Sequence, residues 1–325
     1  MNKNILIVTT GGTIAMKFDE NFGVLPNNEL VQMLKSFPQL SDIAKIDVFE
    51  FTNIPSPYIT PEIMLDLAKL VEKKLPSYDG IVITHGTDTL EESAYFLDLV
   101  LNSKKPIVFT AAMRSGSELG LDGPRNIVGA VRVATAEQSQ DRGVLVVMND
   151  EINCARDVVK TDSGKTDAFA TPDYGLLGII DPDRIVYYRD RIIKEYLPVN
   201  KIETNIDLIK CVAGMGTHHI ESSINKKVKA LVLEAFGRGN IPHSIIPAIK
   251  EALKKEILIV ITSRTYTGRV IPEYGYEGGG KNLQDMGIIM GNDLKGTKMR
   301  LKLMILFGKY NDTSKVREYL EVNQY

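Results

Sequence analysis

Four short apolar runs recur along the first half of this chain, and polar turns followed by segments with helical spacing separate them. The runs lie within residues 5–8, 81–83, 107–109 and 144–148. Runs that are apolar at successive positions are typical of strands covered on both faces in a parallel sheet. Their alternation with helices requires right-handed crossovers. The sequence therefore predicts an α/β fold built on a doubly wound, largely parallel sheet.

The length of 325 residues favours two domains. The strand and helix alternation spans residues 1–190, which we interpret as a large N-terminal α/β domain. Residues 191–206 are charged and show no sustained period, as expected of a linker. The alternation then resumes over 207–325 and predicts a second, smaller α/β domain. Terminal helices are expected near 295–309 and 313–322.

Composition excludes several classes of function. The chain has 39 basic and 41 acidic residues, a net charge of −2, and no long basic run, so it is not built to bind nucleic acid. No apolar run approaches the ~20 residues of a membrane span. The first strand begins within four residues of Met1 and leaves no room for a secretion signal, so a cytoplasmic location is expected. Cys154 and Cys211 are expected to be buried thiols, with a disulfide between them as the alternative.

The strand ends of the first domain carry the segments TTGGT, THGTDT and TAAMRSG. Ligands of open α/β sheets bind at the carboxyl ends of the strands. Gly11 and Gly12 would let a ligand approach the main chain, and Thr13 would then lie just beyond the first strand. A plain glycine turn is the alternative interpretation.

Between these strands we also expect a loop over 16–27 and a short helix over 30–37. A loop or hairpin is expected around Lys160.

Metal and cofactor motifs are missing from the sequence. The four histidines have no zinc-site spacing, and there is no nucleophile elbow, phosphate loop or complete dinucleotide fingerprint. The residue types that remain as candidates for catalysis are threonine, aspartate and lysine. A threonine hydroxyl needs a neighbouring base, and a desolvated lysine can act as one. Two alternatives stay open: Asp88 and Glu91 also form a pattern like a capping box, and Lys160 also fits a solvated surface charge.

The segments TTGGTIAM and ITHGTDTLEESAYFL closely resemble the two signatures of bacterial-type L-asparaginases, the threonine amidohydrolases. The similarity continues through AAMRSGSELGLDGPRNI, RGVLVVMNDEINCARDVVKT and FGRGN, so it covers nearly the whole chain in order. It implies an enzyme that hydrolyses L-asparagine to L-aspartate and ammonia, with side activity on L-glutamine. The implied reaction passes through an ester on threonine and needs no cofactor.

The resemblance also implies roles for particular residues. Thr13 matches the nucleophile. Thr87, Asp88 and Lys160 match a second catalytic cluster, in which the threonine and the aspartate also contact substrate. Further substrate contacts are expected from Gly12, Ser56 and Ala112.

One departure from the family pattern concerns the loop after Thr13, where Phe22 stands in place of a tyrosine. The missing hydroxyl would be dispensable or would come from Tyr274 or Tyr276. Asn240 and Glu277 match residues that reach a neighbouring subunit's site. A homodimer or homotetramer with active sites at the subunit interface is therefore expected.

Two other functions remain as alternatives. One is a glutaminase-like subunit of a transfer-RNA amidotransferase, although the chain lacks the extra amino-terminal domain of such subunits. The other is a regulatory protein that binds aspartate or asparagine without catalysis, which Phe22 alone favours.

Overall fold

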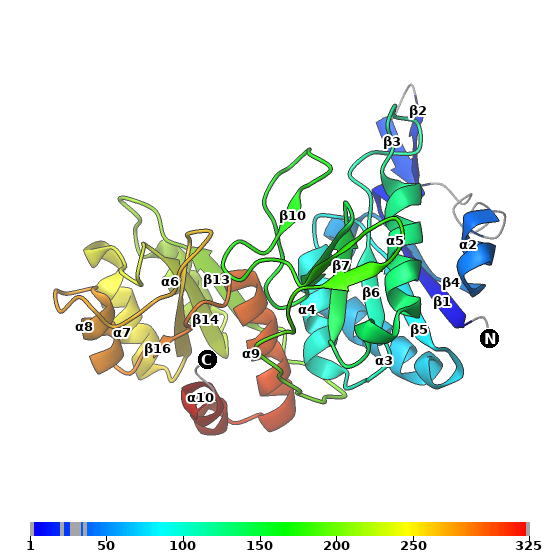
Figure 1. Cartoon of the computed structure of the whole chain (residues 1–325). Coiled ribbons are helices and arrows are strands. Elements are labelled where there is room, and N and C mark those ends of the chain that lie inside the picture. Colours follow the sequence, from blue (N-terminus) through cyan, green and yellow to red (C-terminus); the bar gives the residue numbers. More distant parts are fainter. Residues whose placement is uncertain (1–2, 20–22, 27–33, 35–37, 323–325) are drawn as a thin grey trace. The chain divides into compact units, whose positions relative to one another are not determined.

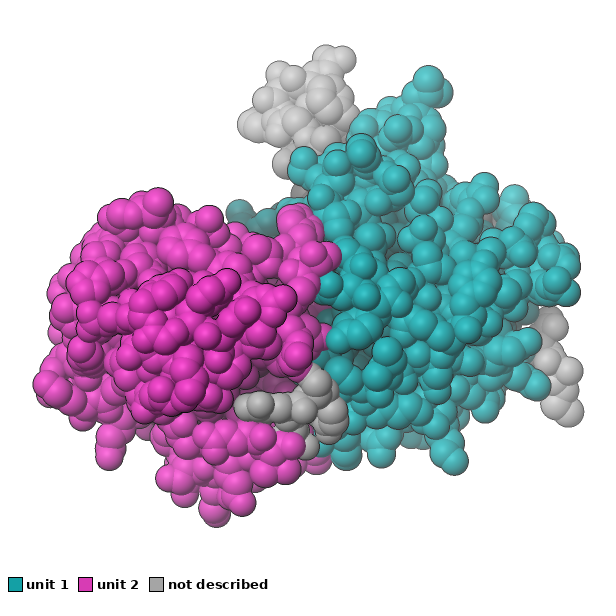
Figure 2. Space-filling model, turned by 60° about the vertical axis from the view of Figure 1, so that its left-hand side comes forward, with its two compact units in different colours: residues 1–196 teal, residues 197–325 magenta. Residues whose placement is uncertain are grey.

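The chain divides into two compact units, residues 1–196 and residues 197–325, coloured separately in Figure 2. The structure is a computed structural model that describes residues 3–19, 23–26, 34 and 38–322, with the backbone alone for 15–19 and 23–26. We describe each unit by itself. The helix expected over 30–37 falls almost wholly outside the described residues, and so does Phe22.

Unit 1 is organised around a large sheet with strand order β12-β11-β8-β7-β6-β5-β1-β4. Its strands are β1 (Asn4–Gly11), β4 (Lys45–Ile54), β5 (Gly80–Thr84), β6 (Ile107–Thr110), β7 (Val144–Met148), β8 (Glu151–Cys154), β11 (Gly178–Ile180) and β12 (Ile185–Tyr187). From β4 to β7 all neighbours are parallel, and from β7 to β12 they are antiparallel. The predicted doubly wound, largely parallel sheet is confirmed.

Helices cover both faces of this sheet (Figure 1). They are α2 (Pro38–Ile43) and α5 (Gly123–Thr135) on one face, and α3 (Pro61–Lys74) and α4 (Leu90–Val100) on the other. Alternate residues of each strand enter the two cores: Ile5 and Ile7 of β1 pack with residues of α5 such as Ile127. Because both strand faces are buried, the strands read as continuous apolar runs.

The parallel strands have a topological switch point between β1 and β5. The chain passes from β1 to β4 on one side and then crosses to β5 on the other side of β1. The connection after β1 runs to β4 and the connection after β5 runs to β6, in opposite directions along the sheet, which opens a crevice outside the carboxyl ends of β1 and β5. The segments TTGGT and THGTDT end these two strands.

Two small hairpins lie at this end of the sheet (Figure 1). One pairs β2 (Met16–Asp19) with β3 (Gly23–Pro26). The loop expected over 16–27 is therefore wrong for the described residues, because a four-residue strand is too short to show a period amid charged neighbours. The other hairpin pairs β9 (Val159–Lys160) with β10 (Phe169–Ala170) and confirms the hairpin alternative around Lys160.

Unit 2 contains a parallel sheet with strand order β13-β14-β15-β16. Its strands are β13 (Ile206–Lys210), β14 (Ala230–Ala235), β15 (Leu258–Ser263) and β16 (Ile289–Met290), and its helices are α6 (His218–Asn225), α7 (Ile246–Lys254), α8 (Gly280–Asp285), α9 (Gly296–Tyr310) and α10 (Thr313–Val322). Helix α9 packs against β13, β14 and β15, whereas α6 and α7 contact each other and share a core with the strands. The terminal helices α9 and α10 confirm the sequence prediction.

Short 3-10 turns complete the secondary structure. They are η1 (Thr13–Ala15), η2 (Ser56–Tyr58), η3 (Leu75–Ser77), η4 (Glu137–Ser139) and η5 (His243–Ile245). The first two directly follow β1 and β4. They therefore place Thr13 and Ser56 beyond adjacent strand ends.

Cys154 and Cys211 are both buried and free, as expected. Burial raises the pKa of the Cys154 thiol to about 12 and that of the Cys211 thiol to about 11, so both stay protonated and unreactive.

Across the described part of the chain, no helix combines the length and apolar character that crossing a bilayer requires.

Candidate active site

The strand ends at the switch point approach each other through two glycines. Gly12 has a φ of +84°, which L side chains rarely adopt. A Cβ atom at Gly12 would lie 2.3 Å from the Cα of Gly86. Only glycine at both positions permits this approach, which brings Thr13 and Thr87, the next residues along each segment, to the same crevice.

Ser56 joins this pair from the end of β4. It is 5% exposed, and a Cβ atom at Gly86 would lie 2.6 Å from the Ser56 Cβ. The Ser56 hydroxyl accepts a hydrogen bond from the backbone N–H of Asp88 at 3.2 Å, and its carbonyl accepts one from the Thr89 hydroxyl at 2.9 Å. These bonds fix the turn that carries Thr87 and Asp88.

Lys160 reaches the same turn from β9. Its Nζ donates hydrogen bonds to Thr87 Oγ1 at 3.0 Å and to Asp88 Oδ1 at 2.7 Å. The lysine side chain is 18% exposed and the aspartate side chain 59%. Lys160 is therefore not the solvated surface charge of the alternative interpretation. It links a hydroxyl and a carboxylate at one edge of the crevice.

The capping interpretation of Asp88 is wrong. Helix α4 begins at Leu90, its N-cap residue is Thr89, and no side chain caps it. The carboxylate of Asp88 instead pairs with Lys160. The Glu91 carboxylate also contacts that lysine: its Oε2 accepts a hydrogen bond from the backbone N–H of Lys160 at 2.6 Å. Sequence reasoning missed this contact.

His85 is fully buried and contacts both the turn that carries Thr87 and Asp88 and the helix α4 that follows it. Its Nδ1 lies 2.8 Å from the carbonyl oxygen of Gly86, and its Nε2 lies 3.0 Å from Ser93 Oγ. A carbonyl can only accept, so Nδ1 carries the proton and Nε2 accepts from the Ser93 hydroxyl. Burial lowers the pKa of His85 to about 4, which keeps the ring neutral near pH 7.

Ala112 lies in the loop after β6 and is 1% exposed. A Cβ atom at Gly123 would lie 3.1 Å from Ile14 Cγ1 and 3.4 Å from Ala112 Cβ, so this loop is close to the residue after Thr13. The carboxylate of Asp122 holds the loop by accepting from the backbone N–H groups of Met113 and Arg114, both at 3.0 Å.

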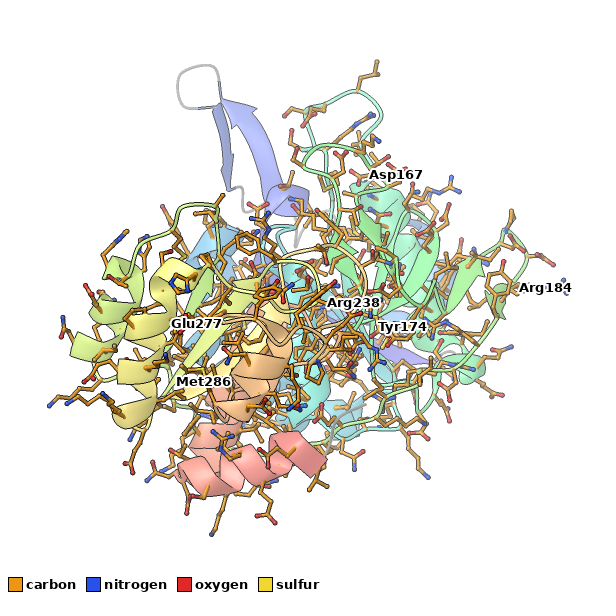
Figure 3. The ribbon with its side chains drawn as sticks, turned by 90° about the vertical axis from the view of Figure 1, so that its left-hand side faces the viewer. Asp167, Tyr174, Arg184, Arg238, Glu277 and Met286 are labelled. Atoms are coloured by element: carbon orange, nitrogen blue, oxygen red, sulfur yellow. The ribbon has the colours of Figure 1, made fainter. Side chains whose placement is uncertain are left out.

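The residues predicted to act on a neighbouring subunit all lie in unit 2. Asn240 Oδ1 accepts from the Gly280 N–H at 3.3 Å, and the rings of Tyr274 and Tyr276 lie 5.7 Å apart. Glu277, labelled in Figure 3, pairs with Lys250 at 3.0 Å and with His243 at 2.9 Å. The hydrogen bond from Lys250 holds the pKa of the Glu277 carboxyl below its ordinary value.

No three His, Cys, Asp or Glu side chains within the described residues are grouped so that they could hold a metal ion. The polar side chains named above at the crevice are instead the hydroxyls of Thr13, Ser56 and Thr87, the carboxylate of Asp88 and the ammonium of Lys160. Such a set can polarise a carbonyl compound, move protons and position water.

The two α/β units and this hydroxyl, carboxylate and ammonium cluster define a two-domain α/β protein whose site suits nucleophilic and acid–base chemistry. The family model "Asparaginase, N-terminal" matches residues 4–193, and "Glutaminase/Asparaginase C-terminal domain" matches residues 205–320. The chain therefore belongs to the bacterial-type asparaginase family.

Individual relatives are similar over nearly their whole length. The chain is 34% identical to an L-asparaginase of Bacillus licheniformis, over 96% of this chain and 98% of that protein. It is 32% identical to a glutaminase-asparaginase of Acinetobacter glutaminasificans, over 97% and 98%. The crystal structure of a probable cytoplasmic L-asparaginase from Campylobacter jejuni is 33% identical, covers 98% of this chain and 99% of its own, and gives a TM-score of 0.87.

Proposed function

We propose that this protein is an L-asparaginase that hydrolyses the side-chain amide of L-asparagine to L-aspartate and ammonia. The observation that carries the proposal is the contact of Lys160 with both Thr87 and Asp88 at the β1/β5 switch point of an asparaginase-family chain. The names of its relatives support the same substrate.

In the proposed first step, the Thr13 hydroxyl attacks the carbon of the side-chain amide. Backbone N–H groups of the crevice stabilise the negative oxygen of the tetrahedral intermediate. The C–N bond then breaks, the hydroxyl proton leaves on the amine as ammonia, and a β-aspartyl ester remains on Thr13. Gly12 and the backbone at Ala112 line the pocket.

In the proposed second step, water attacks the ester carbon. Thr87 and Lys160 position this water, and Lys160, in its neutral amine form, takes the proton of the water through the Thr87 hydroxyl. As the ester bond breaks, that proton passes to the Thr13 oxygen, which restores its hydroxyl, and aspartate is released. Asp88 holds the α-amino group of the substrate, and Ser56 contacts its carboxylate. The hydrogen bond from the Asp88 N–H to the Ser56 hydroxyl supports these two roles, because it keeps Asp88 and Ser56 side by side, as the α-amino and α-carboxylate groups of one substrate require.

L-Glutamine is a second candidate substrate. A relative at 32% identity is named a glutaminase-asparaginase. Glutamine is longer by one methylene group, and such a difference is worth only about 1–3 kcal/mol in a binding pocket. We therefore propose a weak glutaminase activity beside the asparaginase activity.

We further propose that residues 1–190 carry the catalytic cluster, that 191–206 link the units, and that 207–325 act on the site of a neighbouring copy through Asn240, Tyr274, Tyr276 or Glu277. The division of the chain near residue 196 supports this arrangement. The enzyme would be a homodimer or homotetramer. It would act in the cytoplasm, the location that the name of the Campylobacter jejuni relative gives for that protein.

Ammonia release from asparagine and glutamine, measured beside aspartate binding, tests the function. We expect Thr13→Ala to lower the asparagine kcat roughly 10³-fold or more while aspartate binding and the circular dichroism spectrum are kept. Turnover near that of the wild type would refute the nucleophile assignment. Aspartate binding without ammonia release from the wild type would support the regulatory alternative instead.

A further inference from the structure

The backbone of Lys160 is held by a carboxylate that lies 69 positions earlier in the sequence. Glu91 Oε2 accepts the Lys160 N–H at 2.6 Å in a partly buried position. A hydrogen bond to an ionised carboxylate is shorter and stronger than one between neutral groups. Such a bond fixes the position of the main chain at Lys160.

The hairpin around Lys160 leaves this N–H available. Strand β9 pairs with β10 on one edge, where the Thr161 N–H donates to the Ala168 carbonyl at 2.7 Å. Since hydrogen-bonded and non-hydrogen-bonded pairs alternate in an antiparallel ladder, the neighbouring Lys160–Phe169 pair is of the second kind, and the Lys160 N–H donates to Glu91 of α4. Figure 3 labels Asp167 in the turn of this hairpin. Glu91 thus attaches the β9–β10 hairpin to α4, a helix that packs against the large sheet of unit 1.

Both ends of Lys160 are therefore bound by one short segment. Glu91 binds its backbone, and Thr87 and Asp88 bind its ammonium at 3.0 and 2.7 Å. Since the three partners fall within five successive residues, the lysine has one fixed point at each end of its flexible side chain. Movement of the main chain at Lys160 would change both ammonium contacts.

We propose that Glu91 is a positioning residue for the reaction, acting through the backbone of Lys160. This inference rests on the proposed function, because it assumes that Lys160 moves protons in catalysis. In this proposal Glu91 acts on the reaction through Lys160 and not by contact with the substrate. Its carboxylate keeps the Lys160 ammonium between Thr87 and Asp88.

Substitution of Glu91 measures this role. Glu91→Ala should lower kcat about 10- to 100-fold with little change in KM, whereas Glu91→Gln, which keeps an acceptor oxygen, should recover most of that loss. Glu62→Gln is the matched control, because Glu62 also lies in the first turn of a helix, α3, but is exposed. It should leave kcat unchanged and so exclude a general effect of losing a helix-terminal charge.

A double-mutant cycle distinguishes positioning from structural damage. If Glu91 acts through Lys160, then Glu91→Ala should lower the residual rate of Lys160→Met no more than about twofold. The proposal is overturned if the two losses multiply, or if Glu91→Ala alone retains the wild-type kcat.

An independent readout covers the contact itself. The Lys160 amide signal, assigned in lysine-labelled protein by its disappearance in Lys160→Met, should exchange faster with solvent in Glu91→Ala. Faster exchange with an unchanged kcat would contradict the positioning role and leave the proposed function standing. Wild-type turnover by Lys160→Met would contradict the proposed function instead.

Discussion

Lys160 and Asp88 form an ion pair whose position folding alone does not explain. More than half of the Asp88 side chain is exposed, 59%. Exposed pairs of this kind contribute about 0–1 kcal/mol to stability, because water screens them and two side chains must be ordered. The pair is therefore poorly suited to hold the fold, and its contact with Thr87 is better explained by chemistry.

The site could be predicted from the sequence only in part. Thr13, Thr87 and Asp88 follow apolar runs, so the neighbouring sequence alone predicts that they lie at strand ends. Lys160 carries no local signal, since its contacts with Thr87 and Asp88 span more than 70 positions. The family resemblance supplied it. The spacing of Glu91 from Asp88 suits a helix start as well as it suits a tertiary contact, so the sequence does not distinguish the two.

His85 makes the free energy of unfolding depend on pH. Its pKa is about 4 in the folded chain and about 6.5 when unfolded, so the unfolded state binds more protons between these values. The stability from the neutral ring is complete above pH 6.5 and is lost as pH falls towards 4. The loss should reach about 2 kcal/mol at about pH 5.

Urea unfolding of the wild type and of His85→Asn at about pH 7.5 and about pH 5 measures this term. Circular dichroism is the suitable probe, since the chain has no tryptophan. The variant should be less stable at the higher pH but should lose about 2 kcal/mol less on acidification. Equal acid losses in both proteins would show that His85 does not titrate in this range.

At the level of elements, the contact between the ends of β1 and β5 depends on two glycines. Gly12→Ala would place a methyl group 2.3 Å from the Gly86 Cα, which is backbone and cannot turn aside. We expect a loss of about 2 kcal/mol or more in stability and at least a 100-fold fall in kcat, because the strand ends must separate. Thermal unfolding and ammonia release measure the two effects.

Gly164→Ala is the control for this substitution. Gly164 lies in the turn of the β9–β10 hairpin, and a Cβ atom there meets nothing within 4 Å. Its stability and kcat should match those of the wild type. If Gly12→Ala is equally harmless, the close approach of the two strand ends is not required for the site.

The long elements were predictable and the short ones were not. Strands such as β5 and β7 are buried along their whole length, and α3 begins at the expected Thr60 cap, so their residues alone specify them. Strands β11 and β12 have three residues each and pair antiparallel at the sheet edge. Whether such a short segment forms a strand depends on the neighbouring strand with which it pairs, and the residues of the segment alone do not specify that neighbour.

At the level of the whole molecule, the two units differ in what they contribute. Thr13, Thr87, Asp88 and Lys160 all lie in unit 1, whereas Asn240 and Glu277 lie in unit 2. Asn240 uses its Oδ1 to hold the start of α8 through the Gly280 N–H, and its side-chain NH₂ is a separate donor. A role on a neighbouring copy would require that donor.

Mixing two inactive variants tests whether sites are shared between copies. Asn240→Asp keeps the acceptor oxygen for Gly280 but removes the donor, and Thr13→Ala removes the proposed nucleophile. In a mixed dimer, one site would combine both substitutions and the other would have neither. Equal amounts, unfolded together and refolded, should therefore regain about a quarter of wild-type activity, because half of the dimers are mixed and each has one intact site.

The outcome depends on mixed assemblies being present, so differently tagged variants should be co-purified before the assay. Thr13→Ala mixed with Lys160→Met is the control, since both changes fall in unit 1 and no mixed assembly would contain an intact set. Recovery in the first mixture alone would place Asn240 in a neighbour's site. If mixed assemblies form and neither mixture recovers activity, or if the wild-type enzyme is an active monomer by light scattering, each chain holds a complete site and the proposed sharing is wrong.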